Sequence, residues 1–198
     1  MTVSYKTAKS GKINIYADGE FRFAVSPVIW YSLGISEGDE IDPDGLERIK
    51  ELADSAAAYE KALSLLSYRQ HSESELYMKL RRSFPAEASR QAVEKCSAAG
   101  LTDDEKFASL LADELYRRKH FAPQRIIAEL VNRGIDKNTA ENAVLTLDID
   151  RDSGIIEILS KMNVTADSSE KDRARAFRRL LNAGYSYHEI NNFLSTGE

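Results

Sequence analysis

Two different hydrophobic periods divide the chain. Near the N-terminus, GKINIYADGEFRFAV (11–25) alternates apolar and polar residues, which is the period of β-strands, and Asp18-Gly19 separates the two runs. Asp-Gly favours the positive backbone angles of a two-residue type I′ turn, so the stretch predicts a β-hairpin. An isolated hairpin is marginally stable in water, and we expect this one to pack on the rest of the fold. Its expected packing residues are Ile13, Ile15, Phe21, Phe23 and the segment 28–33.

From about Leu46 onward the apolar residues recur at helical spacing. The acidic stretch before it, ISEGDEIDPDG (35–45), is expected to be a connection because it holds Gly38, Pro43 and Gly45. In the middle of the chain, spacings of three, four and seven place three successive apolar sets each on one helical face. These sets are Phe107, Leu110, Leu111 and Leu115; Ile126, Ile127, Leu130 and Val131; and Ala140, Ala143, Val144 and Leu147.

The helical part also repeats. ELVNRGI (129–135) aligns with RLLNAGY (179–185) at an offset of 50, and KLRRSF (79–84) fits the same frame with one residue deleted. Three copies of a three-helix unit explain this pattern most simply. We therefore predict a mainly α protein, an elongated array of three tandem three-helix units preceded by an N-terminal β-hairpin segment. The predicted parts are 1–54 with the hairpin and a short helix, and the units 55–100, 101–147 and 148–198.

Residues typical of helix ends support these units. Gly134 and Gly184 stand where a left-handed C-terminal cap is expected, each before an apolar residue. The pairs Ser72/Glu75, Thr102/Glu105 and Ser186/Glu189 have the spacing of a capping box at a helix start. With Thr102 as the cap, the acidic run 103–105 forms a first helical turn, where the helix dipole favours negative charge. Its carboxylates then diverge, which speaks against a metal or acid–base site.

Composition is that of a globular protein, with 42% hydrophobic and 30% charged residues in 198. No apolar run approaches the roughly 20 residues of a membrane span, and the N-terminus lacks the apolar core of a secretory signal, so we expect a cytoplasmic protein. Cys96 is the only cysteine, which excludes an intramolecular disulfide and a thiolate metal cluster. It aligns with Leu147 in the next unit, so it is expected to be a core residue rather than a nucleophile.

No pattern in the sequence indicates catalysis. The phosphate-binding patterns GxxxxGK[ST] and GxGxxG are missing, as is the nucleophile pattern GxSxG. The three histidines, His71, His120 and His188, are scattered, without a second histidine at ligand spacing. We therefore expect no catalytic residue, no metal site and no cofactor. An enzyme that uses the acidic runs is the least favoured hypothesis, because it requires converging carboxylates.

Charge is distributed unevenly around the net value of −5. Only residues 59–135 are net positive, with 13 Lys and Arg against 11 Asp and Glu. In the last unit Lys171, Arg175, Arg178 and Arg179 fall within about 100° of a helical circumference, opposite Phe177, Leu180 and Leu181. The full set of candidate contact residues is Lys79, Arg82, Arg117, Arg118, Lys119, Arg125, Arg133, Lys171, Arg175, Arg178 and Arg179. These form a solvated face, or they contact an acidic protein surface or a nucleic-acid backbone.

Four stretches in this order resemble the RecX family of bacterial recombinase regulators. They are ALSLLSYRQHSESELYMKL (62–80), AGLTDDEKFA (99–108), APQRIIAELVNRGID (122–136) and RLLNAGYSYHEI (179–190). The hairpin sequence KINIYADGEFRFAV is similar to the N-terminal extension of some members. The chain departs from the family pattern at SFP (83–85), which lacks the usual glycine, and in the helix expected at 151–162.

The resemblance implies a non-enzymatic regulator of RecA, with roles in DNA repair, DNA recombination and the SOS response. Family members bind the RecA filament on single-stranded DNA and generally lower its ATPase, strand-exchange and co-protease activities. The expected partner is thus the RecA filament, with single- or double-stranded DNA as a further partner, no membrane and a monomeric chain. The alternative is a helical DNA-binding module that acts directly on DNA without a recombinase.

Overall fold

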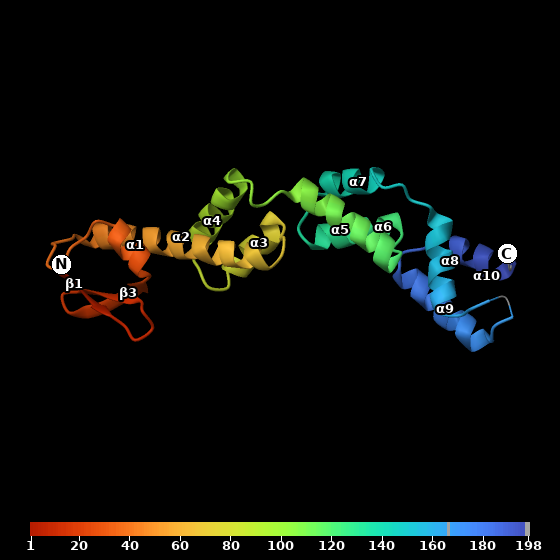
Figure 1. Cartoon of the computed structure of the whole chain (residues 1–198), viewed down its shortest axis with the longest axis horizontal. Helices are drawn as coiled ribbons and strands as arrows, with labels where there is room; N and C mark the ends of the chain where they lie inside the picture. Colours follow the sequence, from red (N-terminus) through yellow and green to blue (C-terminus); the bar gives the residue numbers. More distant parts are fainter. Residues whose placement is uncertain (166, 197–198) are drawn as a thin grey trace. The chain divides into compact units, whose positions relative to one another are not determined.

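The computed structural model describes residues 1–165 and 167–196, and in them three strands are followed by ten helices (Figure 1). The chain divides into two compact units, Met1–Thr102 and Asp103–Glu198. The predicted fold class is confirmed, since the described chain is mainly helical after a small N-terminal sheet. Among the helices of this described part, none is long and apolar enough to cross a membrane.

The N-terminal sheet contains the predicted hairpin and one further strand. Strands β1 (Val3–Thr7), β2 (Ile13–Ala17) and β3 (Glu20–Val25) are antiparallel in the order β1-β2-β3. Asp18 and Gly19 have φ angles of 51° and 80°, the left-handed values that a type I′ turn requires. Strand β1 was not predicted, although Val3 and Tyr5 alternate with the polar Ser4 and Lys6, because this run of five residues is short and no two-residue turn signal links it to β2.

A register shift in the hairpin corrects the predicted packing of Phe21. Ile15 pairs with Phe23, but Tyr16 pairs with Phe21, so β3 has one extra residue at Arg22. Such a bulge reverses which face the following side chains occupy. Phe21 is therefore 56% exposed and meets the Tyr16 ring edge-on at 5.9 Å instead of entering the core.

The sheet packs on two helices. Ile13, Ile15 and Val25 share a buried cluster with Trp30 of α1 (Pro27–Ser32) and Ala53 of α2 (Pro43–Tyr68). Helix α2 begins inside the stretch that was predicted to be a connection. Asp42 caps it by accepting a hydrogen bond from the Gly45 backbone N–H, and Pro43 suits the first turn because that position needs no N–H.

The second half of α2 forms a three-helix bundle with α3 (Glu73–Leu80) and α4 (Ala86–Ala98). Leu76, Leu80 and Cys96 are almost fully buried in its core. Ser72 caps α3, as predicted, by accepting a hydrogen bond of 3.0 Å from the Glu75 N–H. Cys96 is a core residue as expected, and burial raises the pKa of its thiol, which disfavours the reactive thiolate.

A second bundle consists of α5 (Asp104–Lys119), α6 (Pro123–Asn132) and α7 (Lys137–Leu145). Its buried cluster includes predicted residues together with Ala108 and Ala112. Leu110 and Val131 were predicted to be buried but are 54% and 43% exposed. Small alanines bring the helices close together, so the buried stripe is shifted from the one that large side chains suggest.

The start of α5 also differs from the prediction. Asp103, not Thr102, is the N-cap, and its carboxylate accepts a hydrogen bond of 2.9 Å from the Lys106 N–H. Thr102 is buried and its hydroxyl donates instead to Glu73 at 3.2 Å. Asp104 and Glu105 do lie in the first turn, as predicted, where the helix dipole stabilises their negative charges.

Three further helices complete the described chain, α8 (Arg151–Lys161), α9 (Glu170–Asn182) and α10 (Tyr187–Thr196). Gly184 has a φ angle of 94° and the Tyr185 N–H donates to the Leu180 carbonyl, which is the predicted left-handed cap. The predicted capping box at α10 is complete, because Ser186 accepts from the Glu189 N–H and Glu189 accepts from the Ser186 N–H. Leu181 is 42% exposed, against the expectation that it is buried.

Candidate partner-contact surface

Helix α9 carries four of the candidate cations. Lys171, Arg175, Arg178 and Arg179 are all exposed on one face, while Ala176 and Leu180 on the opposite face are fully buried. Ser169 fixes the start of this helix by accepting a hydrogen bond from the Asp172 N–H. The apolar face of α9 therefore orients the four cations toward solvent.

These four cations differ from the candidates Arg117, Arg118 and Arg125 in their ion pairing. Within residues 1–165 and 167–196, none of the four forms an ion pair with a carboxylate. In contrast, Arg173 faces inward on the same helix and donates to the Leu194 carbonyl of α10. The outward cations of α9 therefore remain available to an external anion.

The end of α5 is basic but partly neutralised. Arg117 pairs with Asp113 at 2.5 Å and Arg118 pairs with Glu114 at 3.3 Å, both one helical turn away. Such exposed pairs are worth about 0.3–0.5 kcal/mol, so a partner can displace them at little cost. Lys119 lies in the same last turn, where the helix dipole stabilises positive charge.

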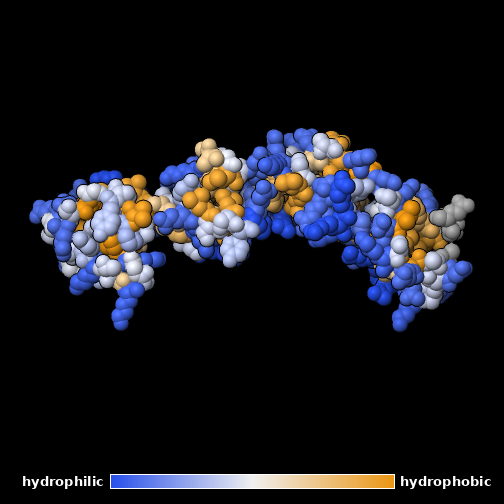
Figure 2. Space-filling model, in the orientation of Figure 1, coloured by the Kyte–Doolittle hydropathy of each residue, from blue (hydrophilic) through white to orange (hydrophobic). Residues whose placement is uncertain are grey.

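Phe121 connects two of the candidate cations. The Lys119 ammonium lies 5.6 Å from its ring centre, and the Arg125 guanidinium lies 5.5 Å from it. Arg125 is also 3.6 Å from Glu129 on α6, so its charge is partly compensated. Figure 2 shows that hydrophilic residues dominate the drawn face over α5 and α6.

The remaining candidates are less accessible or lie elsewhere. Arg133 is half-buried where α6 ends, and it is not without an interaction partner. Lys79 is half-buried in the last turn of α3, and Arg82 is exposed just after it. These last two residues belong to the first compact unit, whereas the α5, α6 and α9 cations belong to the second.

Sequence reasoning missed the joint between the α5–α7 and α8–α10 bundles. Here the Tyr185 hydroxyl donates to the His120 carbonyl at 3.0 Å, and the Ala122 N–H donates to the Ala183 carbonyl at 2.9 Å. Phe121 and Ala122 pack in the same buried cluster as residues of α8, α9 and α10. The two bundles thus share a core, and this joint connects the basic surfaces of α5, α6 and α9.

Two glycines are the sequence signal for this joint. A Cβ on Gly154 would lie 2.0 Å from the Tyr185 hydroxyl oxygen, and one on Gly184 would lie 2.5 Å from Arg125 Cβ. Gly154 stands inside a helix, where glycine is otherwise unfavourable. A glycine at such a position indicates that another part of the chain approaches closely.

His120 lies at the centre of the joint. It ends α5 in the left-handed conformation, with a φ angle of 54°, and its Nε2 is 2.6 Å from the Lys161 ammonium. Burial lowers the pKa of His120, and the nearby charges of Lys161 and Arg179 lower it further, against the opposing effect of Glu157. The neutral ring accepts the lysine hydrogen bond, which a protonated ring is unable to do.

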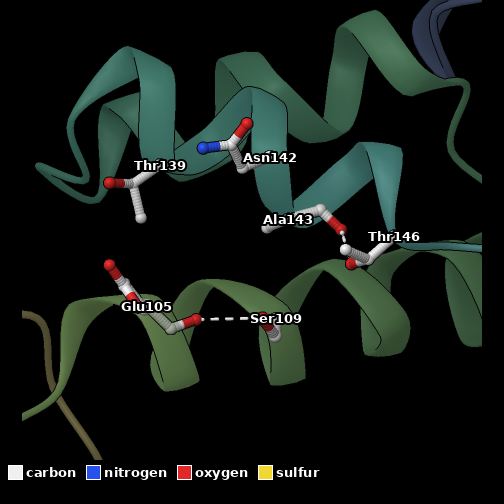
Figure 3. A pocket seen from close by; sticks show the side chains of 6 residues that line it. All are labelled: Glu105, Ser109, Thr139, Asn142, Ala143 and Thr146. Carbon is white, nitrogen blue, oxygen red and sulfur yellow. Dashed lines mark hydrogen bonds between the residues drawn. The ribbon is translucent and has the colours of Figure 1, made fainter.

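A small polar hollow lies between α5 and α7 (Figure 3). It has a volume of about 240 Å³ and is lined by Glu105, Ser109, Thr139, Asn142, Ala143 and Thr146. The Ser109 hydroxyl donates to the Glu105 backbone carbonyl, so no base is paired with it as in a nucleophilic site. Across the described ranges, no group of three His, Cys, Asp or Glu residues is placed to hold a metal ion.

The fold and surface define a class of protein made of consecutive small helical bundles that presents cations on helix faces. Two family models match within the chain, described as the first three-helix domain of RecX at residues 58–96 and the second at residues 103–144. The chain belongs to the RecX family.

Curated relatives and solved structures extend these matches along the chain. Regulatory protein RecX of Caldanaerobacter subterraneus is 26% identical over 195 residues, covering 96% of this chain and 95% of its own. Regulatory protein RecX of Clostridioides difficile is 26% identical over 93% of this chain and 88% of its own.

The solved structures concern the fold. A crystal structure of regulatory protein RecX covers 98% of both chains with a TM-score of 0.65 at 21% identity. RecX from Lactobacillus salivarius aligns with 72% of this chain and 95% of its own, with a TM-score of 0.56 at 24% identity. Both likenesses therefore extend beyond the two domains matched by the family models.

Proposed function

We propose that this chain regulates RecA by binding the RecA filament formed on single-stranded DNA. In this proposal it lowers the ATPase, strand-exchange and co-protease activities of the filament, without catalysis of its own. Membership in a family of regulatory proteins supports a regulatory role. The observation that carries the contact surface is the set of unpaired, outward cations on α9.

The proposal includes the organisation of the molecule. The parts 1–54, 55–100, 101–147 and 148–198 act as successive modules of a monomeric cytoplasmic protein, each contacting the filament weakly. Contacts linked in one chain gain by effective concentration, so their combined affinity exceeds that of one contact by about 10²–10⁴. Bound modules then hinder protomer addition or the shape change that accompanies ATP hydrolysis.

Replacing the α9 cations tests the contact surface. We expect the triple variant Arg175→Ala, Arg178→Ala, Arg179→Ala to bind RecA filaments about 10-fold more weakly or worse, because exposed charge pairs contribute about 0.2–1 kcal/mol each. Cosedimentation with filaments measures this loss. A matched variant, Lys12→Ala, Lys61→Ala, Lys95→Ala, removes the same charge from exposed sites outside the candidate set and is expected to bind normally. Equal binding by both variants would contradict the role of α9.

A second candidate function is direct DNA binding without a recombinase. It is favoured by the partly buried Phe121 between Lys119 and Arg125, since cations beside an aromatic ring suit single-stranded nucleic acid. The two functions differ in their requirements. Direct binding persists without RecA and weakens steeply with salt, by about 0.7–0.9 in log–log slope for each phosphate contacted.

A further inference from the structure

The first compact unit contains a cleft that lies outside the basic surfaces of α5, α6 and α9. It lies between the first half of α2 and the beginning of α4 and has a volume of about 570 Å³, within the usual range of ligand sites. Its lining residues are Glu47, Arg48, Lys50, Glu51, Leu52, Asp54, Ser55, Pro85, Glu87, Ala88 and Gln91.

Part of the cleft is apolar. Leu52 is 59% exposed, although it stands one residue before Ala53, which is buried under the N-terminal sheet. Pro85, the exposed residue just before α4, adds further apolar surface, whereas Ala88 is already buried in the bundle core. Burying such surface against a partner is favourable by about 25 cal/mol for each Å² removed from water.

The charge of the cleft is acidic. Four of its side chains are carboxylates and two are cations, and both cations are within ion-pair distance of a carboxylate. Lys50 is 3.4 Å from Glu47, and Arg48 is 3.8 Å from Asp42. Glu51 and Asp54 form no ion pair among the described residues, and burial raises the pKa of Asp54 because its charge is poorly solvated. A cation from outside would relieve this cost.

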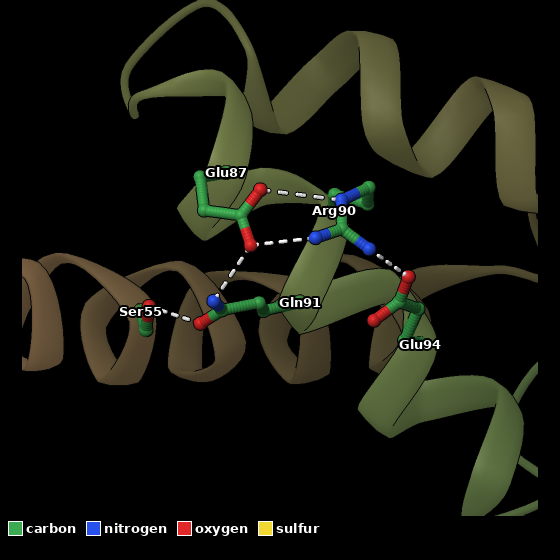
Figure 4. Close-up of polar contacts among 5 residues, drawn as sticks. All are labelled: Ser55, Glu87, Arg90, Gln91 and Glu94. Carbon is green, nitrogen blue, oxygen red and sulfur yellow. Dashed lines mark hydrogen bonds and ion pairs between the residues drawn. The ribbon is translucent and has the colours of Figure 1, made fainter.

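A hydrogen-bond network holds one wall of the cleft (Figure 4). The buried Ser55 hydroxyl donates to the Gln91 side-chain carbonyl at 2.7 Å, and the Gln91 amide donates to Glu87 at 2.8 Å. Arg90 then bridges Glu87 and Glu94 at 2.6 and 2.5 Å. Because α2 and α4 are joined in this way, the cleft is formed before a partner arrives, which lowers the entropy cost of binding.

We infer that this cleft docks a segment of a partner protein in which lysine or arginine side chains flank aliphatic ones. The aliphatic side chains cover Leu52 and Pro85, and the cations reach Glu51 and Asp54. An amphipathic helix laid along a groove between two helices has this arrangement. Polyanions are repelled by the same carboxylates, so the cleft and the cationic face of α9 select partners of opposite charge.

A synthetic helix with leucines along one face and lysines beside them is the probe. We expect it to bind the full chain, as measured by fluorescence anisotropy, and the double variant Glu51→Gln, Asp54→Asn to bind it about 3- to 20-fold more weakly. Leu52→Ala is expected to weaken binding about 5-fold. Glu60→Gln and Leu63→Ala are matched controls, because they lie on the same helix outside the cleft and are expected to bind as the parent does.

Several outcomes would overturn the inference. One is unchanged binding by both the double variant and Leu52→Ala. Another is equal binding of a probe that carries glutamates in place of lysines. Displacement of the probe by spermidine, together with no effect of Leu52→Ala, would show that the cleft attracts small cations only. Circular dichroism of each variant confirms that a loss of binding is not a loss of folding.

Discussion

At the scale of single residues, the joint between the second and third bundles depends on an absent side chain. The Tyr185 hydroxyl occupies the space next to Gly154 that a Cβ would fill, and from there it reaches the His120 carbonyl. An aromatic ring in a packed core has little freedom to move aside. Gly154 therefore sets the approach of the two bundles.

This contact reverses the usual effect of a helical glycine. Replacing an interior helical glycine by alanine normally stabilises a protein by about 0.5–1 kcal/mol. We expect Gly154→Ala to destabilise this one by about 1–3 kcal/mol, because the ring must shift and its hydrogen bond is lost. Urea unfolding measures the change, with Ser160→Ala on the exposed side of α8 as a neutral control. A more stable Gly154→Ala protein would refute the close approach.

His120 makes the same joint sensitive to acid. Its lowered pKa means that the unfolded chain takes up a proton before the folded chain does. The free energy of unfolding is therefore expected to fall as the pH drops through about 6.5, the ordinary histidine value, and to keep falling until the lowered native pKa is passed.

A non-titrating variant isolates this effect. Asparagine adopts the left-handed backbone conformation readily, so His120→Asn is expected to fold normally. This variant keeps His71, whose pKa is also lowered by burial. We expect denaturation midpoints of this variant to depend less on pH between 7 and 5 than those of the parent protein. An identical pH dependence would exclude His120 as a source.

At the scale of elements, the local signals named in the sequence located helix ends correctly except where two signals compete. Ser72 and Ser186 cap helices as predicted, because each is the only capping residue at its position. At the start of α5, Thr102 and Asp103 both have side chains suited to capping, and the sequence does not show that the Thr102 hydroxyl is engaged by Glu73. Tertiary contact decided between them.

Buried faces were predicted less accurately than helices. Leu110, Val131 and Leu181 carry large apolar side chains at helical spacing, yet they are partly exposed, while alanines occupy the closest helix contacts. The prediction for Phe21 is wrong for another reason. A bulge in β3 changes the sheet face that Phe21 occupies, and the sequence pattern of the hairpin does not show this bulge. The outward position of the α9 cations was predictable because the opposite face is strongly apolar.

The cap of α5 provides a test of the corrected helix start. Asp103→Ala is expected to lower the free energy of unfolding by about 0.5–2 kcal/mol, because the Lys106 N–H loses its acceptor. Glu105→Gln removes only a charge near the helix dipole, so its expected effect is smaller, about 0.3–1 kcal/mol. Thermal unfolding of both variants gives the comparison. A larger loss for Glu105→Gln would restore Thr102 and Glu105 as the capping pair.

At the scale of the whole molecule, four separate buried clusters occur along the described chain instead of one central core. The last two clusters along the sequence are joined by Phe121 and Ala122, which bring the α9 surface and the α5–α6 surface into one compact unit. The finer four-part division stays a prediction. Small linked bundles suit a partner that repeats the same surface, as a filament does, because each bundle needs only a weak contact.

The central claim is that this chain regulates the RecA filament. The most direct measurement is RecA ATPase activity on single-stranded DNA, titrated with this protein from well below one molecule per RecA protomer up to parity, at two salt concentrations. The account predicts a rate that falls with added protein, with a weaker effect at the higher salt because exposed charges are screened. An ATPase rate that stays unchanged throughout the titration would contradict it.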